Sequence, residues 1–149
     1  MKNIKLNLQV STNIKNFIPK KKKIFHWIKS ILKKKTEITI CIVNIQEIKK
    51  LNFIYRNQNK PTNILSFQYP NMYIKNYLFI GDLIICAKIL ETEAKIQNKY
   101  IEAHWAHIII HGILHLIGYN HNNKYQEIIM EQIEIETMKK LGYKNPYII

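Results

Sequence analysis

The pattern of hydrophobic and polar positions changes its period several times along the chain, and each change marks an expected element. Alternating or continuous runs rich in β-branched residues predict strands at residues 5–10, 37–44, 64–69 and 77–86. Apolar positions that recur every three or four residues predict helices at residues 16–32, 46–55, 87–99, 102–117 and 124–141. Together they predict one layered domain over residues 1–149, of the α+β or α/β kind. We expect the α+β form, a mixed sheet of about four strands packed with helices.

Two prolines and the last helix add detail to this outline. Pro19 falls near the start of the first helix, and Pro70 is expected to end the third strand. The last helix has apolar residues on one side (Ile128, Ile135, Met138 and Leu141) and glutamates opposite (Glu127, Glu131 and Glu134). It is therefore expected to pack its apolar side over the helix at 102–117.

That helix, at residues 102–117, is apolar on every side, which predicts burial. His111 and His115 are four apart and lie on one face, one turn above the other. Gly118 suits a left-handed residue that ends the helix, so that His121 can return toward the first two imidazoles. Core histidines bonded to backbone carbonyls are the simpler alternative for the first pair alone. Three imidazoles with a fourth position left open are typical of a catalytic zinc site, and we expect one Zn²⁺ ion there.

The residue after the first of these histidines argues against proteolysis. The spacing His-x3-His-x2-Gly-x2-His matches that of the metzincin metalloproteases, in which a Glu directly after the first His acts as general base. Here that position is Gly112, which cannot transfer a proton. We therefore expect a zincin-like metal helix without peptide hydrolysis by the usual zincin route.

Charge is distributed unevenly along the chain. The 149 residues hold 23 Lys and Arg against 10 Asp and Glu, a net charge of +13. Residues 1–75 hold 16 of the basic residues and 2 of the acidic ones, whereas residues 76–149 hold 7 and 8. A basic half favours a polyanionic partner, most simply nucleic acid, although a coding bias toward Ile, Lys and Asn accounts for part of the excess.

The cysteines and the hydropathy pattern indicate the compartment. Cys41 and Cys86 lie in apolar strand-like runs, where buried free thiols are expected rather than a disulfide. No uninterrupted apolar run is long enough to span a bilayer. We therefore expect a cytoplasmic protein with no membrane partner.

Two side chains draw attention because the chain uses each type once. Arg56 is the single arginine, and its planar fork favours a site that holds a phosphate or a carboxylate. Asp82 is the single aspartate, and it could orient a histidine ligand or pair with Arg56. A structural salt bridge or an ordinary Gly-Asp turn is the plainer alternative for both residues.

With these residues in view, the chain resembles the YbeY family of bacterial endoribonucleases, also called rRNA maturation factors. The matching segments are LN…YR at 51–56, PTNILSF at 61–67, IGDLIIC at 80–86, EAHWAH at 102–107, HGILHLIGYNH at 111–121, ME…E at 130–134 and LGY at 141–143. The resemblance runs from about residue 36 onward. Two departures stand out: the family usually has Asp where this chain has Asn120, and Pro with acidic residues where it has Gln68 and Pro70.

The resemblance implies a metal-dependent, single-strand-specific endoribonuclease that trims the 3′ end of small-subunit ribosomal RNA and acts in ribosome quality control. It implies zinc on His111, His115 and His121, with Arg56 as the functional arginine, and ribosomal RNA and the ribosome or its assembly factors as partners. The rival interpretation is a non-catalytic, zinc-containing ribosome-assembly factor. Structural zinc normally has four protein ligands, and the chain offers three good candidates, which favours catalysis.

As a hypothesis, positively charged side chains bind the RNA and stabilise the transition state of its cleavage. Arg56 would stabilise the extra negative charge of the phosphodiester transition state, and the lysine-rich half would hold the RNA backbone. No general base is identified, and His104 and His107 could be structural.

Overall fold

The chain alternates strands and helices in the order that the hydrophobic pattern predicts. The structure is a computed structural model that describes residues 3–148, except for the side chains of residues 70 and 71. Its elements are β1 (Ile4–Val10), α1 (Lys21–Lys29), β2 (Thr36–Val43), α2 (Ile45–Arg56), β3 (Ile64–Ile74), β4 (Tyr77–Cys86), α3 (Ala87–Ile96), α4 (Ile101–Leu116) and α5 (Lys124–Lys140).

The strands of this part of the chain form one mixed sheet of four, in the order β1-β2-β4-β3. β1 runs parallel to β2 and β2 runs parallel to β4, whereas β3 is antiparallel to β4. β3 is therefore an edge strand with one free side. The predicted α+β fold with a mixed sheet of about four strands is confirmed.

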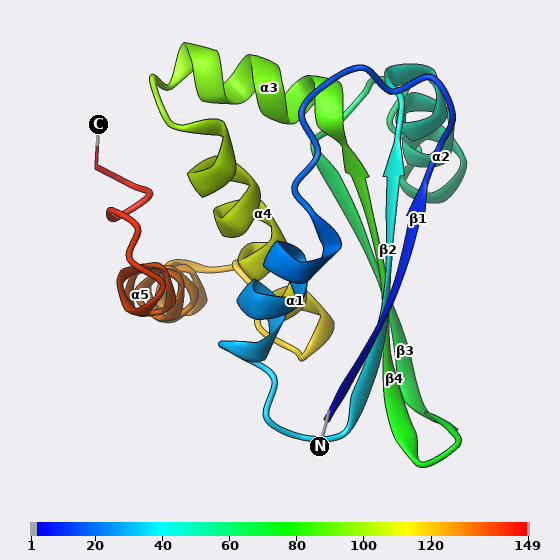
Figure 1. Cartoon of the computed structure of the whole chain (residues 1–149), viewed down its shortest axis with the longest axis vertical. Coiled ribbons are helices and arrows are strands. Elements are labelled where there is room, and N and C mark those ends of the chain that lie inside the picture. Colours follow the sequence, from blue (N-terminus) through cyan, green and yellow to red (C-terminus); the bar gives the residue numbers. More distant parts are fainter. Residues whose placement is uncertain (1–2, 149) are drawn as a thin grey trace.

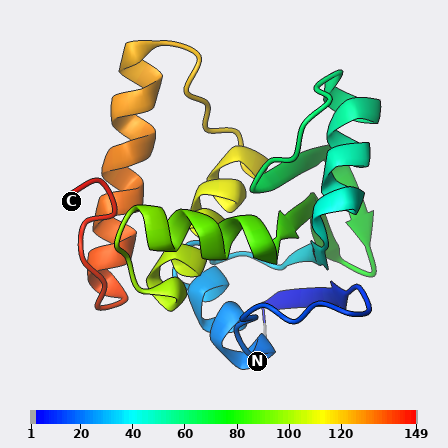
Figure 2. The same ribbon diagram turned by 90° about the horizontal axis from the view of Figure 1, so that it is seen from above.

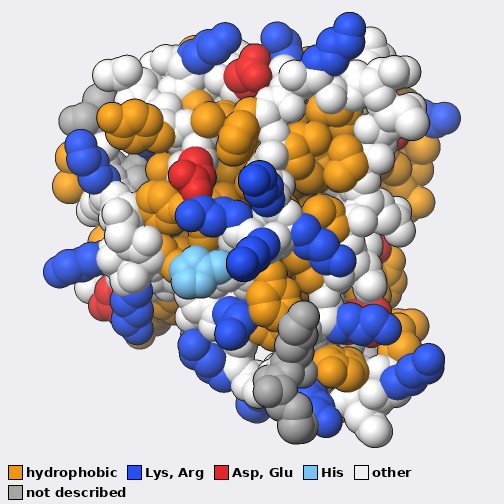
Figure 3. Space-filling view, in the orientation of Figure 1, with side chains coloured by type: hydrophobic (Ala, Val, Ile, Leu, Met, Phe, Trp, Pro, Cys, Tyr) orange, Lys and Arg blue, Asp and Glu red, His pale blue; other side chains and the backbone are white. Residues whose placement is uncertain are grey.

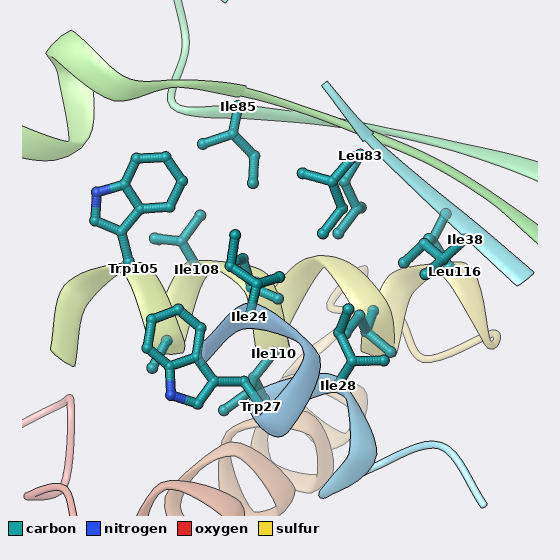
Figure 4. Close-up of a cluster of buried hydrophobic side chains, with 14 of the residues drawn as sticks. Ile24, Trp27, Ile28, Ile38, Leu83, Ile85, Trp105, Ile108, Ile110 and Leu116 are labelled. Atoms are coloured by element: carbon teal, nitrogen blue, oxygen red, sulfur yellow. The ribbon is translucent and has the colours of Figure 1, made fainter. Parts of the chain in front are cut away.

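Helices cover both faces of the sheet. α1 and α4 lie on one face with α5 behind α4, and α2 lies on the other face (Figures 1 and 2). The larger core fills the space between the sheet, α1 and α4, where Trp27 and Trp105 are completely buried (Figure 4). A smaller core lies under α2 around Ile48. Because fully burying one such large apolar side chain contributes about 1.5–3 kcal/mol, the mostly buried α4 is held firmly.

Helix α1 is shorter than predicted. The expected helix at 16–32 begins only at Lys21 and ends at Lys29. Its N-cap, Lys20, has an extended backbone, and Pro19 before it disfavours helical geometry for the residue that precedes it. Phe17, which was expected on the apolar stripe, is 43% exposed. The remaining predicted elements, apart from the third strand, differ from the observed bounds by at most three residues.

Strand β3 is longer than predicted. Pro70 does not end it, because the strand continues to Ile74. The pairing with β4 instead shifts register between Gln68 and Met72, as at a β-bulge. A bulge tolerates proline because the extra residue donates no ladder hydrogen bond.

Basic side chains are numerous on the face that carries α1. Figure 3 shows Lys and Arg side chains over the middle and lower part of this face, separated by apolar patches. Within the described residues, no helix is both long and apolar enough to cross a membrane.

Both cysteines are free thiols: Cys86 is buried as expected, whereas Cys41 is only half-buried.

Candidate metal centre

The end of α4 brings three histidines together. After Leu116 the helix closes with a Schellman motif, in which Gly118 N–H donates to the His115 carbonyl (3.1 Å) and Tyr119 N–H donates to the Leu114 carbonyl (2.9 Å). Gly118 has a φ of 108°, which an L side chain rarely adopts. The predicted positive-φ helix end is therefore present, and the chain returns along α4.

The returning loop places the third imidazole beside the other two. The ring centroids of His111 and His115 lie 4.7 Å apart, and His121 lies 4.8 Å from His115 and 5.7 Å from His111. One ring nitrogen from each residue lies within 4.8 Å of the others. The structure thus brings together the three histidines that the spacing singled out.

The spacing of these nitrogens suits one metal ion. Nε2 of His111 and Nε2 of His115 are 3.2 Å apart, and two nitrogens on one tetrahedral zinc lie about 3.3 Å apart, given a Zn–N bond of 2.0–2.1 Å. Burial and the neighbouring His111 and His121 lower the pKa of His115 to about 4. Its imidazole is neutral at pH 7 and keeps a lone pair for a metal. The donor set therefore fits Zn²⁺ or another divalent ion that prefers imidazole.

Glu134 was not anticipated as part of this centre. It was expected on the side of α5 facing away from α4, but its side chain is completely buried. His111 Nδ1–H donates to Glu134 Oε2 (3.0 Å) and His107 Nε2–H donates to Oε1 (2.5 Å). Burial alone would raise the pKa of Glu134, but the hydrogen bonds from His107 and His111 outweigh it and lower the pKa to about 2.

The packing of α5 on α4 is confirmed, with Met138 buried as expected, but the rest of the face was predicted only in part because the helix is only weakly amphipathic. Its buried residues include Met130, Glu134 and Met138, which are four apart and so share one face. Ile128, which was expected on that face, is 53% exposed. The signal available in the sequence was the four-residue spacing of the two methionines on either side of the glutamate. It was missed because a charged glutamate is normally assigned to the exposed face of a helix.

Arg56 lies in the same cleft as the histidines. It is the last residue of α2, and its guanidinium donates to the Ser66 carbonyl of edge strand β3 (2.7 Å) and lies 5.1 Å from the centre of the Phe67 ring. The cleft has a volume of about 660 Å³ and is lined by Arg56, residues 63–69, Asn120 and the three histidines. The arginine and the candidate metal ligands therefore face one shared space.

Asp82 neither orients a histidine nor pairs with Arg56. In the described structure its carboxylate accepts a hydrogen bond from the Tyr69 hydroxyl (3.1 Å). Tyr69 stacks on Phe79 with ring centres 5.2 Å apart, and it lines the cleft while remaining 41% exposed. Asp82 thus holds an aromatic ring in the cleft wall, a contact that the sequence did not indicate.

At Gly112, α4 lies directly against side chains of β3 and β4. A Cβ atom at this position would come within 2.7 Å of Ile64 Cδ1 and 2.9 Å of Leu83 Cδ2. The position that holds the zincin general base is therefore filled by the side chains of Ile64 and Leu83.

Comparisons with family models and with known sequences identify the same family. Residues 4–142 match the family model described as endoribonuclease YbeY. The endoribonuclease YbeY of Buchnera aphidicola subsp. Acyrthosiphon pisum (strain APS) is 52% identical over 153 aligned residues, which cover 100% of this chain and 98% of that protein. The endoribonuclease YbeY of Wigglesworthia glossinidia brevipalpis is 46% identical, with 95% and 96% covered. The solution structure of TM1509 from Thermotoga maritima is similar in fold (TM-score 0.55, 25% identity, 93% of this chain and 91% of that chain covered).

Proposed function

The chain belongs to the YbeY family of endoribonucleases, and from this premise we propose that residues 1–149 form one metal-dependent domain that cuts single-stranded RNA. Its substrate is ribosomal RNA, at the 3′ end of the small-subunit species, in the cytoplasm. It also serves ribosome quality control, with the ribosome or its assembly factors as partners.

One observation carries this proposal: the three converging imidazoles and the single arginine of the chain line one cleft. His111, His115 and His121 would hold one Zn²⁺ ion, which when bound supplies Lewis-acid chemistry to a phosphate oxygen. Arg56 is anchored to the edge of β3 by its bond to Ser66, so its guanidinium is held ready for a phosphodiester. A fixed positive group next to developing negative charge stabilises the transition state without reorganisation.

The aromatic wall of the cleft supports the preference for single strands. Tyr69 offers an exposed ring, supported by Phe79 and by its bond to Asp82. Unpaired bases stack on such rings, whereas bases in a duplex are already stacked and paired. The lysine-rich half would bind the rest of the RNA backbone, so affinity should fall steeply as salt rises.

The test is cleavage of synthetic RNA by the purified full chain. A single-stranded RNA from the 3′ end of the small-subunit precursor and its duplex form are incubated with the protein, with chelator, and with chelator followed by zinc. We expect cutting of the single strand only, lost with chelator and restored by zinc. His111→Ala should be inactive, whereas His26→Ala, which removes an exposed histidine of α1, should cut normally.

The same experiment separates the rival function. Folded, zinc-loaded protein that leaves every RNA intact would overturn the nuclease and favour the non-catalytic assembly factor. Cutting by His111→Ala at the wild-type rate would overturn the assignment of the metal centre.

A further inference from the structure

The chain beyond the family match touches the candidate metal centre. The match to the family model ends at residue 142, and the segment that follows contacts α4 and α5. Tyr147, in this segment, donates its hydroxyl hydrogen to Glu134 Oε1 (2.6 Å). Its ring also meets the edge of the His107 ring, with centres 5.3 Å apart and planes at 83°.

This contact completes the surroundings of a buried carboxylate. An ionised glutamate accepts hydrogen bonds only, and a buried one needs several donors to remain charged. Glu134 has three: His111 Nδ1–H on Oε2, with His107 Nε2–H and the Tyr147 hydroxyl both on Oε1. The tyrosine therefore supplies one of the three bonds that fix the orientation of the carboxylate.

The carboxylate in turn fixes the ring of His111. Because Nδ1 carries the hydrogen that Glu134 accepts, the lone pair is on Nε2, the nitrogen that lies 3.2 Å from Nε2 of His115. A carboxylate bonded to the far nitrogen of a histidine ligand sets its tautomer and orientation, and raises its basicity.

The segment that carries Tyr147 is itself held in place at several points. Lys99 Nζ donates to the Pro146 carbonyl, and the backbone N–H of Tyr147 donates to the Asn145 side chain (2.8 Å). Tyr143, where the segment begins, accepts a hydrogen bond from Trp27 Nε1 (3.1 Å). The segment that carries the tyrosine is thus also held by bonds outside the metal centre.

We propose that Tyr147 is a positioning residue of the metal centre: through Glu134 it holds His111 in the tautomer and orientation that bind the ion. Docking of the C-terminal segment and metal affinity are therefore coupled. This inference rests on the metal centre of the proposed function and adds a residue to it that never touches the ion.

Zinc affinity of the full chain, measured by competition with a chromophoric chelator, tests the coupling. Glu134→Gln should weaken affinity about 10- to 100-fold, as outer partners of metal ligands usually do. Tyr147→Phe should weaken it by roughly 3- to 10-fold, below that range, because it acts through Glu134. The matched control is Tyr125→Phe on α5, where the ring is 74% exposed, and it should bind as wild type does.

Two further readouts separate positioning from general stability. In metal-free protein, the ring ¹⁵N shifts of His111 should report hydrogen on Nδ1 for wild type and a mixture of tautomers for Tyr147→Phe. The double variant should bind zinc no more weakly than Glu134→Gln alone, because the two residues act in series. All measurements are made where circular dichroism shows each variant folded.

Several outcomes would overturn the inference. If Tyr147→Phe has the zinc affinity and the His111 tautomer of Tyr125→Phe, the C-terminal segment has no role in the metal centre. The proposed function would then still stand. Additive losses in the double variant would also exclude action through Glu134. A folded wild-type chain that binds no zinc would instead overturn the assignment of the metal centre. The role of the C-terminal segment would fall with it.

Discussion

Helix α4 carries four histidines along one side, and the two ends of this row have different surroundings. At the N-terminal end, the rings of His104 and His107 are buried, and each is hydrogen-bonded to a carboxylate. At the C-terminal end, His111 and His115 are half-buried and turn toward a cleft, where a loop adds His121. His104 and His107 are three residues apart and His111 and His115 are four apart, so both spacings place a pair on one side of the helix.

The difference shows that helical spacing alone indicates a metal site, but that the surroundings of the rings determine which histidines can form one. At the buried end, Nε2 of His104 and Nε2 of His107 each meet a carboxylate, and in the described structure their Nδ1 atoms are buried without a hydrogen-bond partner. The rings at the cleft end meet one another, with Nε2 of His111 and Nε2 of His115 3.2 Å apart, a spacing that suits two ligands of one ion. Glu134 lies at the boundary, because it binds one histidine of each end.

The largest expected contrast is in metal binding. His115→Asn removes one of three ligands, so zinc affinity should fall by more than the roughly 100-fold that outer partners of ligands account for. His104→Gln removes a ring that is bonded to Glu93 (2.9 Å), and it should leave affinity unchanged. Metal analysis of both purified variants checks this, and equal zinc loss in the two would end the distinction between the ends.

The next contrast compares two cations. Arg56→Met should lower kcat/KM on single-stranded RNA about 100-fold, the scale for losing one group that stabilises transition-state charge. Lys95→Met, at an exposed cation on α3 that pairs with Glu91, should have no effect. Zinc content should stay at the wild-type value in both variants. An Arg56 variant of normal activity would show that the cleft does not use its arginine.

A smaller effect is expected at the aromatic wall. Tyr69→Leu should weaken binding of single-stranded RNA to chelator-treated protein about tenfold, since stacking contributes about 1–3 kcal/mol per base. Tyr69→Phe keeps the ring and should bind nearly as wild type does. Tyr100→Leu removes an 83% exposed tyrosine at the other end of α4 and serves as the control. Fluorescence anisotropy measures all three, and equal affinities for the two Leu variants would exclude stacking at Tyr69.

The smallest expected effect concerns the contribution of the buried N-terminal end of α4 to the stability of the fold. Burial alone would raise the pKa of Glu93, but hydrogen bonds from His104 and Asn63 lower it below its usual value. Because the folded pKa is the lower one, the stabilisation is present above about pH 4.5 and is lost as the pH falls through the folded value. Glu93→Gln should lower Tm by about 5 °C at pH 7, and the difference should shrink toward pH 3.

Calorimetry across this pH range checks the prediction. Glu136→Gln, at an exposed glutamate, should track the wild type at every pH. A Glu93→Gln difference that stays constant down to pH 3 would mean that the charge of Glu93 does not stabilise the fold.

The part of this centre that the sequence predicts is local. Periodicity places His111 and His115 on one face, and Gly118 ends the helix so that His121 can return. Those relations depend on residues within about three turns of one helix, so no tertiary information is needed.

The rest depends on contacts between distant elements. Glu134 is 23 residues from His111, and burying it is favourable only because three donors meet it, two from α4 and one from the C-terminal segment. Tyr69 and Asp82 meet across the β3–β4 pair, whose register shifts at a bulge that the strand pattern does not reveal. Partners of this kind become visible only once the sheet and the helices are assembled.

Gly112 also limits where this scaffold can go in evolution. The glutamate of a zincin peptidase would stand at this position, where even a methyl group meets Ile64 and Leu83 at 2.7–2.9 Å. A side chain at this position would require the ends of the Ile64 and Leu83 side chains to shift within the core. The glutamate of the peptidase plan therefore needs repacking around Gly112 as well as the substitution itself, although the spacing of the histidines is the same.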